Sequence, residues 1–151
     1  YYMSIRNNKI NKKNRIFCDS HLSLSHPRRK EMYQILKNNK MVDFLNEKVD
    51  HLEIMKKYSE YRFVLSPRGN GLDCHRTWEV FLLGSIVITE TSSLDEMYIK
   101  NNLPVIILKN FNDLNRINCV DSLNALYSKY KNKCSIDNIL EKFNPEYWVK
   151  E

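Results

Sequence analysis

The sequence lacks the long apolar run that a membrane-spanning helix requires. Its longest apolar tract, VFLLGSIVI, is interrupted by Gly84 and Ser85, whereas a transmembrane helix needs roughly 20 consecutive apolar residues. The N-terminus shows no signal-peptide pattern. The chain begins with Tyr1 instead of methionine, so we expect it to be a piece of a longer protein.

Cysteine is present without the spacing of a metal or redox motif. Cys18, Cys74, Cys119 and Cys134 form no CxxC pair and have no ligand spacing with the histidines. The chain is 42% hydrophobic and 11% aromatic, which excludes wholesale disorder and makes a disulfide framework unnecessary. We therefore expect a reducing, cytoplasmic compartment. The Golgi or ER lumen is the alternative if the chain belongs to a membrane-anchored enzyme.

Acidic residues are scarce near the N-terminus. Residues 1–40 carry 10 Lys+Arg against 2 Asp+Glu, a balance of +8, and the remainder carries 14 against 16, a balance of −2. This asymmetry indicates an anionic partner, either nucleic acid or a phosphorylated small molecule. A solvated Asn/Lys-rich segment is the alternative for RNNKINKKNR, residues 6–15. We expect residues 1–14 to be a flexible basic lead-in and residues 15–151 to form one domain.

Strand and helix patterns alternate about four times along that domain and end in a helical tail. Apolar, β-branched runs predict strands at 15–22, 40–48, 61–66, 85–90 and 103–108. Helical spacing of apolar residues predicts helices at 28–39, 51–61, 72–83, 121–132 and 135–143. The alternation predicts an α/β domain with a parallel sheet and right-handed crossovers.

Three local signals set the expected helix boundaries. Pro27 suits the first turn of a helix. Gly84 follows the predicted helix 72–83, where a left-handed residue is wanted. Ser93 and Glu96 have capping-box spacing, which predicts a short helix that begins at Ser93.

Glycine is scarce, and two of the three glycines lie in SPRGNGLDCHRTWE, residues 66–79. The stretch joins a predicted strand to a predicted helix, the junction at which doubly wound sheets bind ligands. Gly69 and Gly71 can adopt backbone angles closed to other residues and allow close approach to the main chain. Arg68 can bind a phosphate in bidentate fashion, and the helix start offers free N–H groups. The loop therefore predicts a phosphate site, with a strain-relieving tight turn as the alternative.

The helix after this loop carries a second signal. Arg76 and Glu79 are three residues apart on one face, with His75 beside them. A simple i,i+3 ion pair is one interpretation. In the other, Arg76 contacts a diphosphate and Glu79 accepts hydrogen bonds from sugar or ribose hydroxyls. We expect His75 to be a polar rim residue and Asp73 to cap the helix.

The segment from Tyr61 to Leu108 resembles the donor-binding domain of exostosin-like glycosyltransferases. YRFVLSPRGNGLDCHRTWEVFLLGSIVITE shows a strand, a PRG-x-G-x-D-x-x-R-x-W-E-type motif and an apolar helix that ends in glycine, and LPVIIL follows as a later strand. Two features depart from the family pattern. Val87 stands where the family usually has proline, and the chain has room for one of the family's two Rossmann-like lobes.

The resemblance implies one lobe of a GT-B fold, a Rossmann-like three-layer domain with a mostly parallel sheet, and no DxD metal motif. It implies a glycosyltransferase that moves a sugar from a nucleoside diphosphate sugar to a hydroxyl of a glycan or glycoprotein, with a second lobe as partner. The nucleotide-sugar site implied by position comprises Arg68, Gly69, Asn70, Gly71, Asp73, His75, Arg76, Glu79, Ser92 and Ser93. No residue is assigned as the catalytic base.

Two further arginines and two other functions stay open. Arg28 and Arg29 begin the helix 28–39 at the same edge of the sheet and could contact phosphate, although we favour solvated surface charge for both. A non-catalytic nucleotide-binding module would need the same loop residues. A basic nucleic-acid-binding domain is disfavoured, because the basic residues are not interleaved with aromatic ones.

Overall fold

A computed structural model of the chain describes residues 2–7, 11–23, 26–72 and 74–149. Its five strands form one sheet in the order β2-β1-β3-β4-β5, and each neighbouring pair is parallel. The strands are β1 (Lys13–Cys18), β2 (Val42–Phe44), β3 (Tyr61–Leu65), β4 (Ile86–Glu90) and β5 (Val105–Leu108). The expected α/β, Rossmann-like three-layer domain is confirmed, with a sheet that is parallel throughout.

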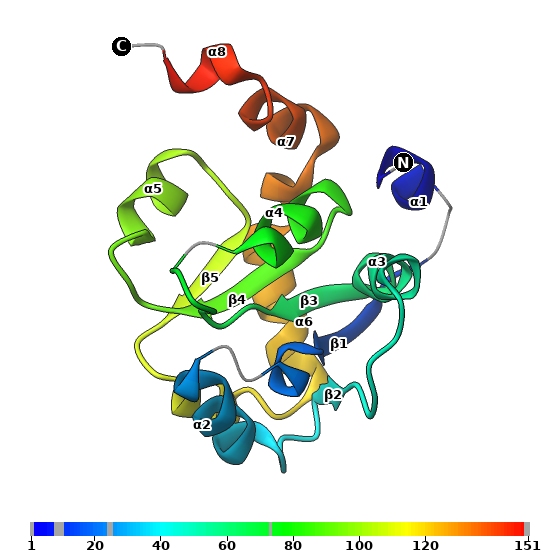
Figure 1. The fold of residues 1–151 in the computed structure, drawn as a ribbon, viewed down its shortest axis with the longest axis vertical. Helices are drawn as coiled ribbons and strands as arrows, with labels where there is room; N and C mark the ends of the chain where they lie inside the picture. Colours follow the sequence, from blue (N-terminus) through cyan, green and yellow to red (C-terminus); the bar gives the residue numbers. More distant parts are fainter. Residues whose placement is uncertain (1, 8–10, 24–25, 73, 150–151) are drawn as a thin grey trace.

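Helices cover both faces of this sheet (Figure 1). They are α1 (Tyr2–Asn7), α2 (Pro27–Leu36), α3 (His51–Glu60), α4 (His75–Leu82), α5 (Asp95–Lys100), α6 (Val120–Tyr130), α7 (Ile136–Lys142) and α8 (Pro145–Trp148). The 3-10 turns of the described residues are η1 (Ser20–Leu22), η2 (Phe111–Arg116) and η3 (Lys131–Cys134). No helix within the described ranges is both long and apolar enough to cross a bilayer.

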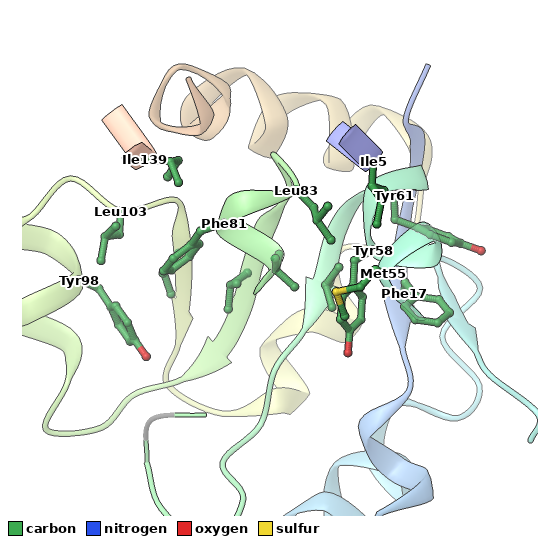
Figure 2. Close-up of a cluster of buried hydrophobic side chains, with 14 residues drawn as sticks. Ile5, Phe17, Met55, Tyr58, Tyr61, Phe81, Leu83, Tyr98, Leu103 and Ile139 are labelled. Atoms are coloured by element: carbon green, nitrogen blue, oxygen red, sulfur yellow. The ribbon is translucent and has the colours of Figure 1, made fainter. Parts of the chain in front are cut away.

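The core divides into two layers because successive strand residues point to opposite faces. Val64 and Val87 face the layer built with α1, α3, α4, α5 and α7, which Figure 2 shows around Met55, Phe81 and Leu103. Phe63 and Leu65 face the other layer, which contains residues of α2, α6 and η2. Burial on both faces explains the nearly continuous apolar runs of the strands.

Residues 2–7 of the expected flexible lead-in form α1, whereas residues 1 and 8–10 of it lie outside the described residues. Ile5 of α1 is buried against α3 and α4, and β1 already begins at Lys13. The Arg6 guanidinium donates to the carbonyl oxygens of Phe81 and Leu82, at 3.2 and 3.1 Å. The sequence suggested solvated charge, but Arg6 satisfies the terminal carbonyls of α4, where a helix favours cations.

Two of the three boundary predictions are confirmed and one is wrong. Pro27 occupies the first turn of α2, and Gly84 follows α4 with a φ of +82°. The predicted capping box at Ser93 does not form, because α5 begins at Asp95. The Asp95 carboxylate instead accepts a hydrogen bond from the backbone N–H of Ser92, at 2.9 Å.

Candidate functional site

The strand order places a crevice between the carboxyl ends of β1 and β3. The chain leaves β1 toward β2 on one side of the sheet, whereas β3 lies on the other side of β1. Helices from the two halves diverge at such a topological switch point and leave room for a ligand. Asp19 follows β1 directly, and Ser66 follows β3.

Arg76 of α4 reaches into this crevice and pairs with Asp19. Its Nε lies 3.2 Å from Asp19 Oδ1 and donates to the hydroxyl of Tyr58, also at 3.2 Å. The side chains of Arg76 and Asp19 are only 13% and 14% exposed. Burial lowers the pKa of Arg76, but the charge interactions with Tyr58 and Asp19 outweigh burial and raise it, so Arg76 stays a cation. The alternative i,i+3 pair of Arg76 with Glu79 is therefore wrong, because Arg76 pairs with Asp19, the residue directly after β1.

Arg29 of α2 is a second cation in the crevice and is 5% exposed. Its Nε donates to the carbonyl oxygen of Arg68, at 3.1 Å. Within the described part of the chain, no carboxylate forms an ion pair with Arg29. Burial and then the nearby Arg76 cation lower the pKa of Arg29. The expectation of solvated surface charge at Arg29 is therefore wrong.

These groups line one cleft with a volume of about 480 Å³. The polar and ionisable residues of its wall are Asp19, Arg29, His51, Tyr58, Cys74, His75, Arg76 and Glu79. The Glu79 carboxylate is 17% exposed and lies 3.3 Å from His51 Nε2, and it accepts a hydrogen bond from the Tyr2 hydroxyl at 3.1 Å. His75 is exposed at the rim, as expected. The cleft thus brings His75, Arg76 and Glu79 together with Arg29.

Cys74 lies where the cleft meets the start of α4. Its Sγ is 3.3 Å from Ser66 Oγ and 3.5 Å from Thr77 Oγ1. Burial raises the pKa of the Cys74 thiol, but hydrogen bonds from Ser66 and Thr77 and the charge of Arg76 lower it overall. The Arg76 Nη1 is 3.9 Å from this sulfur. The cleft therefore favours the negatively charged thiolate form of Cys74, a residue that the sequence did not indicate.

The glycine loop has a different geometry from the expected phosphate cradle. Neither Gly69 nor Gly71 is in the left-handed region; Gly84 is the glycine with positive φ in the described segments. The N–H of Gly69 donates to the carbonyl oxygen of Gly71, at 3.2 Å. Among the described residues, the Arg68 guanidinium makes two long contacts, 3.5 and 3.4 Å, to the carbonyl oxygens of Gly69 and Asn70. The backbone of the loop is thus hydrogen-bonded to itself. The positive groups that could bind an anion in this region belong to arginine side chains.

Arg28 is not a solvated surface charge and has carboxylate partners. Its Nε donates to Glu90 Oε1 at 2.7 Å, its Nη2 pairs with the second oxygen of Glu90, and Nη1 lies 2.5 Å from Glu31 Oε2. Glu90 ends β4, and its side chain is 19% exposed. A bidentate carboxylate pair is strong. A phosphate contact by Arg28 would therefore require this pair to open.

The remaining predicted residues lie apart from the arginine cleft. Ser92 and Arg68 line a separate cavity of about 50 Å³ beside Glu90. Ser92 Oγ accepts a hydrogen bond from the N–H of Leu94, at 3.1 Å, and Ser93 is exposed. Asp73 lies outside the described residues. Across the part that is described, no group of three or more His, Cys, Asp or Glu side chains is arranged to hold a metal ion.

Sequence reasoning missed Asp19, Tyr58, His51 and Cys74 as members of this site. Asp19 had one available signal, because it directly follows a predicted strand at the ligand-binding edge of the sheet. The sequence could not show that Asp19 and Arg76, 57 residues apart, meet, since their pairing depends on β1 and β3 being neighbours.

Comparison with known proteins gives no match to a protein-family model and none among curated proteins. The strand order and the wall of the cleft by themselves define a doubly wound, Rossmann-like α/β domain with a cationic cleft at its switch point.

Proposed function

We propose that the chain is the donor-binding lobe of a glycosyltransferase and holds the diphosphate of a nucleoside diphosphate sugar between Arg29 and Arg76. The burial of Arg29 carries this proposal. Arg29 is 5% exposed, lines the same cleft as the Arg76 cation and has a neutral carbonyl as hydrogen-bond partner. A buried charge without an ion-paired carboxylate costs several kcal/mol. None of the described carboxylates forms an ion pair with Arg29, so a bound anion would offset this cost.

The proposed chemistry is transfer of the sugar to an acceptor hydroxyl of a glycan or glycoprotein, with the nucleoside diphosphate as leaving group. Fixed cations at the diphosphate stabilise the charge that develops there as the glycosidic bond breaks. Glu79, at the same cleft, is positioned to accept hydrogen bonds from ribose or sugar hydroxyls. The donor sugar nucleotide is the substrate, and the proposal invokes no metal or other cofactor.

An inverting transfer also needs a base that deprotonates the acceptor. In two-lobed enzymes this group commonly lies on the other lobe, so we propose a second Rossmann-like lobe as partner. The 151-residue chain alone should then bind donor nucleotide and transfer sugar poorly or not at all. Full transferase activity from this chain would contradict the assignment.

Two alternative functions differ from this proposal in what they predict. A non-catalytic nucleotide-binding module would use the same cleft and would differ only by lacking transfer with a second lobe present. Nucleic-acid binding is disfavoured, because half of the ten N-terminal cations are already hydrogen-bonded or ion-paired within the chain: Arg6, Lys12, Arg15, Arg28 and Arg29.

Calorimetry with UDP, GDP and a short single-stranded oligonucleotide, on wild type and Arg76→Ala, distinguishes these functions. Nucleoside diphosphate binding that is lost in Arg76→Ala supports the donor-binding lobe. Oligonucleotide binding that weakens with salt and is indifferent to Arg76→Ala supports the nucleic-acid alternative and contradicts the proposal.

A further inference from the structure

A second, more apolar cavity of about 190 Å³ adjoins the arginine cleft. The two cavities share four wall residues: Asp19, Val49, Ile54 and Arg76. They therefore form one continuous depression, cationic beside α4 and apolar beside the loop that follows β2. The residues found only in the apolar part are Leu22, Ser23, Leu45 and Lys48.

The apolar part is built from three segments that meet beside β1. Leu22 ends η1, Leu45 follows β2, and Ile54 lies on α3. Leu45 and Ile54 pack against the core with one side and line the cavity with the other. Val49 is an exposed aliphatic side chain, 38% accessible, at the junction with the arginine cleft. Small-molecule sites combine such apolar walls with a few polar groups, which Ser23 and Lys48 supply here.

We infer that this apolar part is the nucleobase subsite of the cleft, an assignment that rests on the proposed function. Arg76 and Asp19 belong to both parts, so a ligand whose phosphates lie at Arg76 has its uncharged end within reach of Val49 and Ile54. The cavity is several times larger than the ~30 Å³ share of one water molecule. A planar ring buries both of its faces between aliphatic side chains, and its edge atoms can hydrogen-bond to Ser23 and Lys48.

The assignment fixes the direction in which the donor lies. The base is placed beside the β2–α3 loop, and the diphosphate lies between Arg76 and Arg29. The ribose is then placed near Val49, with His51 and Glu79 in the same wall. Affinity for a nucleoside diphosphate should accordingly contain an apolar contribution that inorganic pyrophosphate does not have.

Calorimetric titration of the 151-residue chain with UDP, GDP and inorganic pyrophosphate tests the subsite. The variants are Ile54→Thr and Val49→Asn, which preserve charge and approximate size. Ile99→Thr is the matched control, because Ile99 is 68% exposed on α5 and lines neither cavity. Thermal unfolding of each variant verifies that it is folded. We expect each cavity variant to bind at least one of UDP and GDP about fivefold more weakly, the effect of about 1 kcal/mol of lost apolar burial. Pyrophosphate affinity should change less than about twofold.

The possible outcomes separate the subsite from the proposed function. Pyrophosphate binding that depends on Arg76, with nucleoside diphosphates bound no more tightly, overturns the nucleobase subsite and leaves the anion site in place. Equal losses for pyrophosphate and nucleoside diphosphates in Ile54→Thr and Val49→Asn also overturn the subsite. Failure of UDP, GDP and pyrophosphate to bind the wild-type chain overturns both the subsite and the proposed function.

Discussion

Gly84 is the position where the structure makes its sharpest prediction about stability. Its φ of +82° is unfavourable for residues with a side chain, and an added Cβ would lie 3.1 Å from both Cζ and Nη1 of Arg6. The left-handed backbone costs Gly84→Ala about 1–2 kcal/mol. Displacement of Arg6 adds about 1 kcal/mol, because its guanidinium donates to carbonyl oxygens that include Cys134 O, at 2.5 Å.

The sum is a loss of about 2–3 kcal/mol, which lowers Tm by roughly 4–12 °C for a chain of this size. Chemical denaturation of wild type, Gly84→Ala, Arg6→Ala and the double variant measures it. In the Arg6→Ala background the steric part disappears, so Gly84→Ala should cost only the backbone share, about 1–2 kcal/mol. An equal cost in both backgrounds would refute the contact with Arg6, and no cost in either would refute the left-handed conformation.

Three further predictions concern titration, ion pairing and thiol reactivity. Burial, followed by the charge of Arg6, lowers the pKa of the Lys12 ammonium to about 8. The charged Lys12 therefore disfavours the folded state below pH 8. As pH rises from 8 to 10.5, the free energy of unfolding of wild type, measured by urea denaturation, should increase by up to about 3 kcal/mol relative to that of Lys12→Met. A pH-independent difference between the two would contradict this. Glu90→Gln should lower the free energy of unfolding by about 1–2 kcal/mol through loss of a bidentate pair, whereas Glu31→Gln, at a 56% exposed side chain, should cost less than about 0.5 kcal/mol; equal costs would contradict the stronger burial of the Glu90 pair. Mass spectrometry after iodoacetamide treatment should find Cys119 alkylated first, because it is exposed and the Ser122 hydroxyl lowers its pKa, and buried Cys18 last; the opposite order would contradict the burial pattern.

The strands and the larger helices could be predicted from sequence because each carries a strong local pattern. YRFVL and VIIL are runs of residues that suit a strand buried on both faces, and both form strands. α1 has no such local pattern. Tertiary contacts hold it in place, because Ile5 is buried in the core and Arg6 donates a hydrogen bond to a carbonyl oxygen near the end of α4. Pro145 begins α8, and the Asn144 side chain accepts a hydrogen bond from the N–H of Glu146.

The part of the candidate site that lies on one helix could be predicted from the sequence. Arg76 and Glu79 share a helix face, so their presence in one cleft follows from local geometry. Arg29 lies on α2, and Asp19 lies directly after β1. Their approach to Arg76 depends on a strand order that local sequence patterns do not encode. The glycine loop misled the prediction, because the scarcity of glycine suggested unusual backbone angles at Gly69 and Gly71, whereas Gly84 is the glycine with a positive φ in the described segments.

The most direct test of the account is pyrophosphate titration of wild type, Arg29→Met and Lys30→Met. Both substitutions remove one positive charge from neighbouring positions of α2, but Arg29 is buried in the cleft and Lys30 is exposed. Methionine fills the buried volume without a charge, so folding should survive. We predict a loss of at least about tenfold in affinity for Arg29→Met and less than about twofold for Lys30→Met. Equal, small effects would contradict an anion site built on the buried Arg29 cation.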